Sequence, residues 1–315
     1  MQGYTQRAFV TIALNLFITV FMSNLKGILS LAVFRLVGTL PLSWARRLGS
    51  LLGRIGALFD VRMAKVTREN IGLCLPHLTN HQAQQLALKS LRETGKTAAE
   101  ICSLWRSKGS PLQFVCDIEG EDLVKSAYAQ GKGLIVLAPH LGNWEMLGHY
   151  LETIGHVTNL YQPPKIKALE PLIQKSRAKA GCELVPADVK GVAKLLKHLK
   201  SGGISGILPD QHPNDLNSGE FAPFFGEPAL TMTLVHKLLQ RTKCAAVFAF
   251  AKRVEHGFVL VFRKAPEELF SADAQVSLAA LNEGIQSLVK EAPEQYQWEY
   301  KRFKFVDPSG QRRYS

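Results

Sequence analysis

The first third of the chain has apolar residues at helical spacing. From Asn80 to Trp105 they recur every three or four positions, at Leu86, Leu88, Leu91, Ala98, Ile101 and Leu104. The stretch from Trp44 to Phe59 is amphipathic as well, because arginines are interspersed with its leucines. These patterns predict an α-helical platform that precedes the rest of the fold.

From Gly131 onward the pattern changes to short apolar runs separated by helical segments. The runs predict strands at Leu134–Ala138, Cys182–Val185, Gly203–Leu208, Cys244–Phe250 and Phe258–Phe262. Helical spacing predicts helices at Asn143–Ile154, Ile166–Ala180, Val189–Lys200, Leu230–Gln240 and Val276–Lys290. Alternating strands and helices favour an α/β fold with a mixed, mostly parallel sheet flanked by helices, whose functional groups lie at the carboxyl ends of strands.

One long segment, Pro209–Pro228, lies between a predicted strand and a predicted helix. It is rich in Pro, Gly, Asn and Asp, a composition that predicts a loop. Loops of this length inside compact domains are usually functional. We therefore expect this segment to contribute to a site.

The N-terminus begins with two apolar stretches. Ala8–Met22 contains no charged residue, and Gly27–Leu42 is interrupted only by Arg35. Neither alone reaches the roughly 20 residues that a spanning helix needs. The first could cross the bilayer as part of one tilted helix, or the second could lie in the headgroup plane together with the amphipathic stretch that follows. Either way, we expect residues 1–42 to be a membrane anchor and residues 43–315 a single domain.

A cleaved signal peptide fits this N-terminus poorly. Only Arg7 precedes the apolar run, and no small-residue cleavage site follows Met22. The basic residues immediately downstream also oppose translocation. We therefore expect the body of the protein to be cytoplasmic and attached to the membrane.

The charge distribution supports a membrane surface as a partner. The chain has 38 basic and 26 acidic residues, a net charge of +12. Between Met1 and Arg68, nine basic residues face a single acid, Asp60. Because the excess lies beside the apolar segment, it favours anionic lipid over nucleic acid as the partner. A second basic stripe, Lys190, Lys194, Lys197 and Lys200, follows one helix face and indicates either a solvated surface or a docking surface for an acidic carrier protein.

The five cysteines do not form a recognisable framework. They are odd in number and scattered, and no pair has metal-ligand spacing. We expect them to be core thiols in a reducing compartment. No Gly-rich nucleotide fingerprint occurs either, so we expect neither a metal nor a cofactor.

Candidate chemistry is concentrated between Gly131 and Gly155. An apolar strand ends at Ala138, Pro139 stops it, and His140 stands at its exit, with Glu145 five positions later on the next helix. An imidazole suits the task of taking a proton from a hydroxyl near neutral pH. Glu145 could accept a hydrogen bond from the other ring nitrogen and fix the tautomer. By spacing alone, His140 could equally be a loop residue and Glu145 a residue that complements the helix N-terminus.

No nucleophile motif accompanies this histidine. A Gly-x-Ser-x-Gly elbow is absent from the sequence, and no cysteine lies near His140 along the chain. If His140 is a base, we therefore expect direct attack by an acceptor hydroxyl, without an acyl-enzyme intermediate.

The surroundings of His140 resemble a known family. The sequence APHLGNWEMLG at 138–148 resembles the His-x4-Asp/Glu block of the glycerolipid acyltransferase superfamily, in the Gly-Asn-Trp-Glu form of the late acyltransferases of lipid A biosynthesis. Further blocks resemble that family in the same order over nearly the whole chain: ENIGLCLPHLT at 69–79, YQPPK at 161–165, RAKAG at 177–181, LPDQ at 208–211, PFFGEPALT at 223–231 and PEQYQWEYKRFK at 293–304.

This resemblance implies a bacterial inner-membrane enzyme that faces the cytoplasm. It implies transfer of an acyl chain from acyl carrier protein to the hydroxyl of a 3-hydroxyacyl chain on a lipid A precursor, as part of lipopolysaccharide biosynthesis. By the resemblance, His140 is the base and Glu145 its partner. Arg177 matches a family arginine near the active site, where it could stabilise an oxyanion. Asp210, Gln211 and Asn143 are further candidates for shaping the site or binding substrate.

Two departures and two alternatives accompany this hypothesis. Tyr161 and His212 stand where many relatives have other residues, which bears on acceptor and chain preference rather than on the chemistry. A glycerophosphate or glycosyl-lipid acyltransferase would share the His/Glu chemistry, but its Glu-Gly-Thr-Arg block is absent, and Gly-x-x-x-x-Arg occurs only at Gly49–Arg54, in the predicted helical platform before the His140 block. The other alternative is a non-enzymatic, basic, membrane-peripheral protein.

Overall fold

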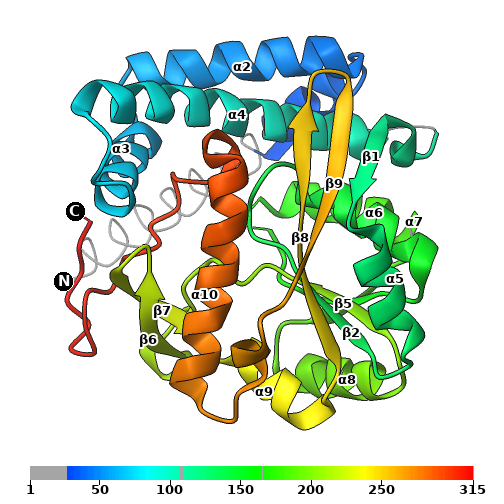
Figure 1. Ribbon diagram of the computed structural model, residues 1–315. Coiled ribbons are helices and arrows are strands. Elements are labelled where there is room, and N and C mark those ends of the chain that lie inside the picture. The colour runs from blue at the N-terminus through cyan, green and yellow to red at the C-terminus, as the bar shows by residue number, and fades with distance from the viewer. Residues whose placement is uncertain (1–26, 107–108, 165, 180, 315) are drawn as a thin grey trace, which may run out of the picture.

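The computed structural model describes residues 27–106, 109–164, 166–179 and 181–314. Its centre is a five-stranded sheet in the order β1-β9-β8-β2-β5 (Figure 1). The strands are β1 (Val115–Glu119), β9 (Gly257–Lys264), β8 (Ala245–Val254), β2 (Leu134–Leu137) and β5 (Ile204–Ile207). Every neighbouring pair is parallel except the β8–β9 hairpin. The predicted α/β fold with a mixed, mostly parallel sheet is therefore confirmed.

Helices cover both faces of this sheet, as the alternation of side chains on β2 requires. Leu134 and Val136 point to a core shared with α5 (Glu121–Ala129) and α6 (Trp144–Ile154). Ile135 and Leu137 point to the opposite core, formed with α8 (Val189–Lys200), α9 (Leu234–Thr242) and α10 (Ala274–Glu291). A strand buried on both faces reads as one continuous apolar run, which is why β2 was predictable.

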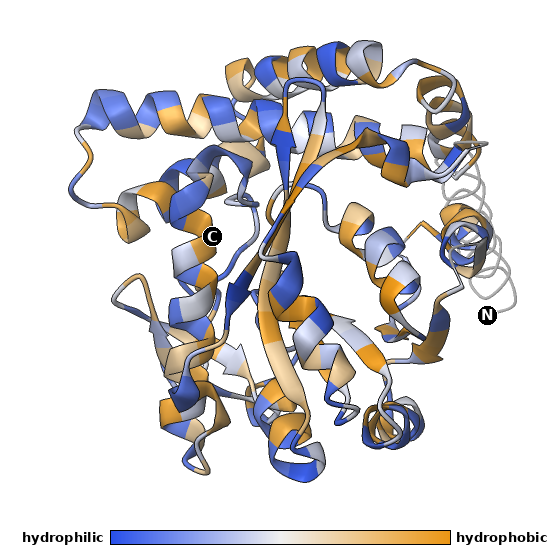
Figure 2. Cartoon of the chain, turned by 45° about the vertical axis from the view of Figure 1, so that its right-hand side comes forward, coloured by the Kyte–Doolittle hydropathy of each residue, from blue (hydrophilic) through white to orange (hydrophobic). Residues whose placement is uncertain are grey.

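The predicted helical platform is also confirmed. It consists of α2 (Leu42–Leu58), α3 (Arg62–Cys74) and α4 (Asn80–Arg106), and residues 27–37 are helical as well. Figure 1 shows α2 and α4 side by side across one end of the sheet. Their backbones come together at two glycines, since a Cβ added to Gly49 would lie 2.2 Å from the carbonyl oxygen of Gly95. In Figure 2 the helices carry both hydrophilic and hydrophobic residues, as expected for helices with one face in a core.

Many of the large hydrophobic side chains that are exposed belong to the N-terminal part of the described chain: Ile28, Leu29, Val33, Leu36, Trp44, Leu51, Leu52, Ile55, Leu58, Phe59, Val61 and Met63. Among the described helices, none is long and apolar enough to span a membrane. The predicted apolar stretch Ala8–Met22 lies outside the described residues. The structure thus leaves the anchoring helix unconfirmed.

Two smaller sheets complete the fold. β3 (Thr158–Tyr161) pairs in parallel with β4 (Glu183–Pro186), and β6 (Gly219–Phe224) pairs in antiparallel with β7 (Glu227–Met232). The remaining elements are α7 (Glu170–Lys179) and short 3-10 turns at Pro111–Phe114, Lys167–Leu169, Leu216–Ser218, Glu267–Phe270 and Pro293–Gln295.

The β6–β7 hairpin overturns two predictions. The segment Pro209–Pro228 is not a continuous loop, and the predicted helix Leu230–Gln240 begins only at Leu234, because Leu230–Met232 belongs to β7. The hairpin turns at Phe225 and Gly226, whose φ angles are 52° and 82°. Two-residue hairpin turns of this kind normally use Asn or Asp with Gly. With phenylalanine in the first position, the usual sequence signal for the hairpin is missing.

Candidate active site

His140 and Asp210 meet because they occupy equivalent places after neighbouring strands. In the parallel β2–β5 pair, Leu137 is opposite Ile207, and each of the two site residues follows three positions later. The Nδ1 atom of His140 lies 2.9 Å from Oδ1 of Asp210, and the backbone N–H of His140 donates to Oδ2 at 3.0 Å. The carboxyl ends of two parallel strands thus place a carboxylate against the imidazole.

This contact defines which ring nitrogen of His140 can act as a base. Burial raises the pKa of the Asp210 carboxyl, but the neighbouring His140 more than offsets burial and holds that pKa below its ordinary value. An ionised Asp210 can only accept hydrogen bonds, so Nδ1 of His140 carries the proton and donates it. The lone pair is then on Nε2, which lies 3.3 Å from the amide nitrogen of Gln211.

The loop that carries His140 is fixed by the C-terminal segment. The backbone N–H of Gly142 donates to the carbonyl of Gln295, and the carbonyl of His140 accepts from the N–H of Gln297. Gly142 has φ +62°, and a Cβ there would lie 2.0 Å from the carbonyl oxygen of Ala251. Glycine is therefore required where the chain turns from His140 into α6.

The carboxylate of Glu145 has different partners from those predicted. Its Oε1 accepts from Nη2 of Arg177 at 2.7 Å, and its Oε2 accepts from the indole N–H of Trp105 at 3.1 Å. The expectation that Glu145 would hold the His140 ring is wrong, because Asp210 takes that position. Glu145 lies in the first turn of α6, where Arg177 and Trp105 occupy its two carboxylate oxygens, whereas Asp210 follows β5 directly.

Arg177 reaches Glu145 from α7 and lies over the Tyr161 ring, with its guanidinium carbon 5.9 Å from the ring centroid. Burial lowers the pKa of Arg177, but the adjacent Glu145 more than compensates and raises it overall. The guanidinium is therefore a permanent positive charge. The sequence-based expectation that Arg177 lies near the His140–Glu145 segment agrees with this position, and its role stays a prediction.

Two cavities flank Trp144, whose ring packs edge-on against His140 with centroids 4.9 Å apart. One cavity, of about 130 Å³, is lined by His140 and is referred to below as the His140 pocket. The other cavity, of about 100 Å³, is lined by Glu145 and Arg177 and by several apolar side chains. We refer to it as the Arg177 pocket. Its apolar lining comprises Val136, Ala138, Leu147, Leu151, Leu160 and Leu208.

The His140 pocket contains polar groups that the sequence did not single out. Gln297 and Glu299 line it, and each has a buried side-chain oxygen that no described residue hydrogen-bonds. Burial raises the pKa of Glu299, so the site favours its protonated form. Both residues lie in the aromatic block at 293–304, whose Tyr296 and Trp298 pack in the core. Only the alternation of buried aromatic and polar residues there could have indicated that the polar ones line a pocket.

Asn143 is fully buried beside the site, and its amide nitrogen donates to the Glu100 carboxylate at 3.0 Å. Glu100 in turn accepts from Arg46 and Arg253, each at 2.6 Å. The predicted part of Asn143 in substrate binding stays a prediction. Its contacts show that it ties the start of α6 to the ion cluster between α4 and the β8–β9 hairpin.

Comparison with known proteins identifies the family of this chain. The family described as bacterial lipid A biosynthesis acyltransferase matches residues 22–305. The lipid A biosynthesis palmitoleoyltransferase of Escherichia coli K12 is 25% identical over 259 residues, which is 82% of this chain and 84% of the relative. The lauroyltransferase of the same strain is 24% identical over 279 residues, or 88% and 90%. A lipid A biosynthesis acyltransferase of Haemophilus influenzae is 26% identical over 254 residues, or 79% of each chain. With most of its length matched, the chain belongs to the bacterial lipid A biosynthesis acyltransferase family.

Proposed function

We propose that this protein transfers a fatty acyl chain from acyl carrier protein to the hydroxyl of a 3-hydroxyacyl chain on a lipid A precursor, at the cytoplasmic face of the bacterial inner membrane. The observation that carries the proposal is the His140–Asp210 pair, with Nε2 of His140 as the basic atom. The family establishes the acyltransferase class. The donor, the acceptor position and the membrane attachment belong to the proposal.

In this mechanism Nε2 of His140 removes the proton from the acceptor hydroxyl as its oxygen attacks the thioester carbonyl. Asp210 stabilises the imidazolium that forms. When the tetrahedral intermediate collapses, the carbon–sulfur bond breaks and the imidazolium returns the proton to the departing thiolate. The products are the ester and the free thiol of the carrier, and His140 is neutral again.

An acyl-enzyme intermediate has no support at this site. Cys182 is the cysteine that lines the Arg177 pocket, and burial raises its pKa to about 12. The thiolate is the nucleophilic form of cysteine, so a thiol with this pKa is a poor nucleophile near neutral pH. Direct attack by the acceptor hydroxyl is therefore the simpler route.

We assign stabilisation of the oxyanion to Arg177. A guanidinium has five N–H donors, and the ion pair of Arg177 with Glu145 runs through Nη2. The remaining donors can face the thioester carbonyl, whose oxygen becomes negative during attack. In this proposal Glu145 acts as a positioning residue that holds the guanidinium at the mouth of its pocket.

The cavities suit long apolar substrates. An apolar groove of about 310 Å³ runs between α2 and α4 and shares Thr94 and Ala98 with the His140 pocket. We assign the hydroxyl-bearing acyl chain of the acceptor to this groove, because its far end opens among the exposed apolar side chains of the platform. The apolar lining of the Arg177 pocket is then available for the part of the donor chain that lies next to the thioester.

The positively charged surface of the protein suits two negatively charged partners, the carrier protein and the membrane. The α8 lysines Lys190, Lys194, Lys197 and Lys200 are a candidate docking surface for an acidic carrier protein, although Lys194 also pairs with Glu183. The exposed apolar residues of α2 lie between the exposed Arg35 and Arg62 along the chain, as in an interfacial segment on an anionic bilayer. In this proposal residues 1–42 additionally anchor the protein in the membrane.

The test uses the purified full-length protein with acyl carrier protein that bears a series of acyl chain lengths. The acceptor is a Kdo-bearing, tetra-acylated lipid A precursor, and the product is weighed by mass spectrometry. We expect a mass gain of one acyl chain for at least one donor, and none with His140→Ala. Absence of this gain with every donor would overturn the proposed reaction. Gain with acyl-coenzyme A but not with the carrier would overturn the donor alone.

A further inference from the structure

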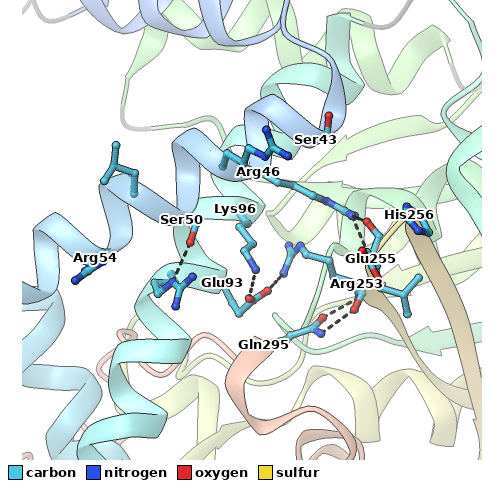
Figure 3. Close-up of a pocket in the computed structure, with 14 residues that line it drawn as sticks. Ser43, Arg46, Ser50, Arg54, Glu93, Lys96, Arg253, Glu255, His256 and Gln295 are labelled. Carbon is cyan, nitrogen blue, oxygen red and sulfur yellow. Dashed lines mark hydrogen bonds and ion pairs between the residues drawn. The ribbon is translucent and has the colours of Figure 1, made fainter.

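A large basic cavity opens next to the His140 pocket. It has a volume of about 760 Å³ and lies between α2, α4 and the turn that joins β8 to β9. Among the lining residues labelled in Figure 3, Arg46 and Arg54 come from α2, Glu93 and Lys96 from α4, and Arg253 from β8. Arg47, Arg92 and His256 also line it.

The inner cations of this cavity are neutralised by carboxylates. Arg46 and Arg253 both contact Glu100, which is fully buried, and Arg253 and Lys96 share Glu93. Burial lowers the pKa of Arg253, yet Glu100 outweighs this and raises it, so the guanidinium stays charged. These residues form the floor of the cavity and hold its walls together.

The outer cations are not neutralised in this way. Arg47, Arg54 and Arg92 are all exposed. Arg92 donates to the Ser50 hydroxyl at 2.9 Å, and the Arg47 guanidinium carbon lies 5.2 Å from the centroid of the Trp44 ring. Within the described part of the chain, no carboxylate pairs with any of these three arginines. The cavity as a whole has six Lys and Arg side chains against Glu93, Glu255 and the buried Glu100, a formal excess of three positive charges.

An excess of positive charge favours an anionic ligand, and the position of the cavity indicates what kind of molecule carries the negative group. Helix α2 faces it with Arg47, Leu51 and Arg54, and faces the apolar groove with Leu48 and Leu52. A single helix thus separates a cationic cavity from a groove fitted to hydrocarbon. An amphiphile with an anionic headgroup and acyl chains can occupy both at once.

The cavity also adjoins the reacting atoms. Gln295 lines both the basic cavity and the His140 pocket. Its side chain makes two hydrogen bonds to the backbone of Arg253, at 2.8 and 3.0 Å, and its carbonyl accepts from Gly142. Because the two cavities adjoin, one acceptor molecule can place an anionic group in the basic cavity and a hydroxyl in the His140 pocket.

We propose that this cavity binds a phosphate monoester on the headgroup of the glycolipid acceptor, through Arg47, Arg54 and Arg92. Guanidinium groups form paired, charge-assisted hydrogen bonds with phosphate oxygens, and a phosphate dianion offsets two of the three excess positive charges. The proposal rests on the proposed function, since it names the part of the acceptor that this site recognises.

The test compares two triple variants with the same change in charge. In Arg47→Ala/Arg54→Ala/Arg92→Ala the outer cations of the cavity are removed. In Lys132→Ala/Lys237→Ala/Arg241→Ala three exposed cations remote from α2 are removed as a control. Because all six side chains are exposed, we expect both variants to unfold at the wild-type temperature, which circular dichroism checks.

Binding is measured by co-sedimentation with phosphatidylcholine vesicles that contain the acceptor glycolipid, either phosphorylated or enzymatically dephosphorylated. We expect the cavity variant to lose at least about tenfold in affinity for the phosphorylated acceptor, and neither variant to differ from wild type on the dephosphorylated one. In the acyl-transfer assay the KM for the acceptor should rise by a similar factor, with kcat within about twofold.

Three results would overturn the proposal. The first is an unchanged affinity of the cavity variant for the phosphorylated acceptor. The second is an equal loss on vesicles of phosphatidylglycerol, which would assign the cavity to membrane phospholipid. The third is a loss that follows removal of the Kdo sugars rather than of phosphate, which would assign it to a carboxylate. Binding needs no turnover, so failure of acyl transfer in the wild type is seen separately in the mass-gain assay.

Discussion

Asp210 receives both a ring N–H and a backbone N–H from His140. Its carboxylate therefore fixes the orientation of the ring as well as its tautomer. An amide in its place would present an NH₂ group to one of these donors, and the ring would turn or change tautomer to accommodate it.

Asp210→Asn should therefore lower kcat by up to about 10⁴-fold while the protein stays folded, by analogy with the same change in serine protease triads. His140→Ala should lose at least about 10²-fold. Single-turnover kinetics and thermal unfolding check both. The exposed Asp117→Asn serves as the matched control and should keep full activity. Near-normal turnover of Asp210→Asn would show that Asp210 does not hold the base.

Glu145 and Arg177 form one functional unit in the proposed mechanism, because the carboxylate acts by holding the guanidinium. We expect Glu145→Gln and Arg177→Gln each to lower kcat by at least about 10²-fold. The double variant should lose little more than the worse single variant, since residues that act as a unit are not additive. Additive losses would instead indicate that the two residues contact substrate independently.

At the residue scale, the sequence singled out side chains that the structure places in one region, but it did not predict their pairing. His140 and Asp210 both follow predicted strands, yet they are 70 positions apart, and no pattern says that these strands are neighbours. Glu145 was the nearer carboxylate along the chain, and the helical turn directs it to Arg177 and Trp105 instead. Sequence proximity is a poor guide wherever neighbouring strands bring distant loops together.

At the scale of elements, the crossing of α2 and α4 depends on residues without side chains. A Cβ on Gly95 would lie 2.0 Å from the carbonyl oxygen of Gly49. The two helices can pack this closely only because these positions lack side chains. Their close approach also shapes the apolar groove between them.

We expect Gly95→Ala to destabilise the protein by at least about 2 kcal/mol, as overpacking at a rigid contact does. Gly72→Ala on α3 is the control, because a Cβ there meets no atom within 4 Å. That change should be neutral or stabilise by up to about 1 kcal/mol, through helix propensity. Urea unfolding measures both. Equal stability of the two variants would mean that the helices can separate without cost.

Element prediction succeeded where burial dominated and failed where a turn was unusual. The strands β2, β5 and β8 read as apolar runs because both their faces are covered. The β6–β7 hairpin was missed because Phe225 occupies a turn position that Asn or Asp usually takes, and its ring packs 5.9 Å from Trp298. β1 was missed because most of its residues are polar or half exposed.

At the scale of the whole molecule, the exposed apolar side chains of α2 and its neighbours form a membrane-facing surface in our proposal. Deletion of residues 1–22 tests whether the N-terminal stretch is the sole anchor. Because the apolar surface is retained, we expect the truncated protein to sediment with anionic vesicles, with affinity reduced but measurable.

Leu58→Glu/Phe59→Glu in the truncated protein should then abolish sedimentation, since both side chains are more than 70% exposed at the end of α2. Phe270→Glu, on the short turn before α10, is the control and should have no effect. Complete release by truncation alone would instead make the N-terminal stretch the sole anchor.

One helix, α4, contributes to three of the cavities described above. Between Leu91 and Cys102 its successive faces line the basic cavity, the apolar groove and the His140 pocket. These residues span only about 16 Å along a rigid rod, so the helix sets how far apart headgroup, hydrocarbon and reacting hydroxyl are held. If the acceptor binds as we propose, the choice of the hydroxyl that is acylated depends on α4 as well as on the loop that carries His140. Relatives that acylate another hydroxyl of the same glycolipid are expected to differ along this helix while they keep His140 and Asp210.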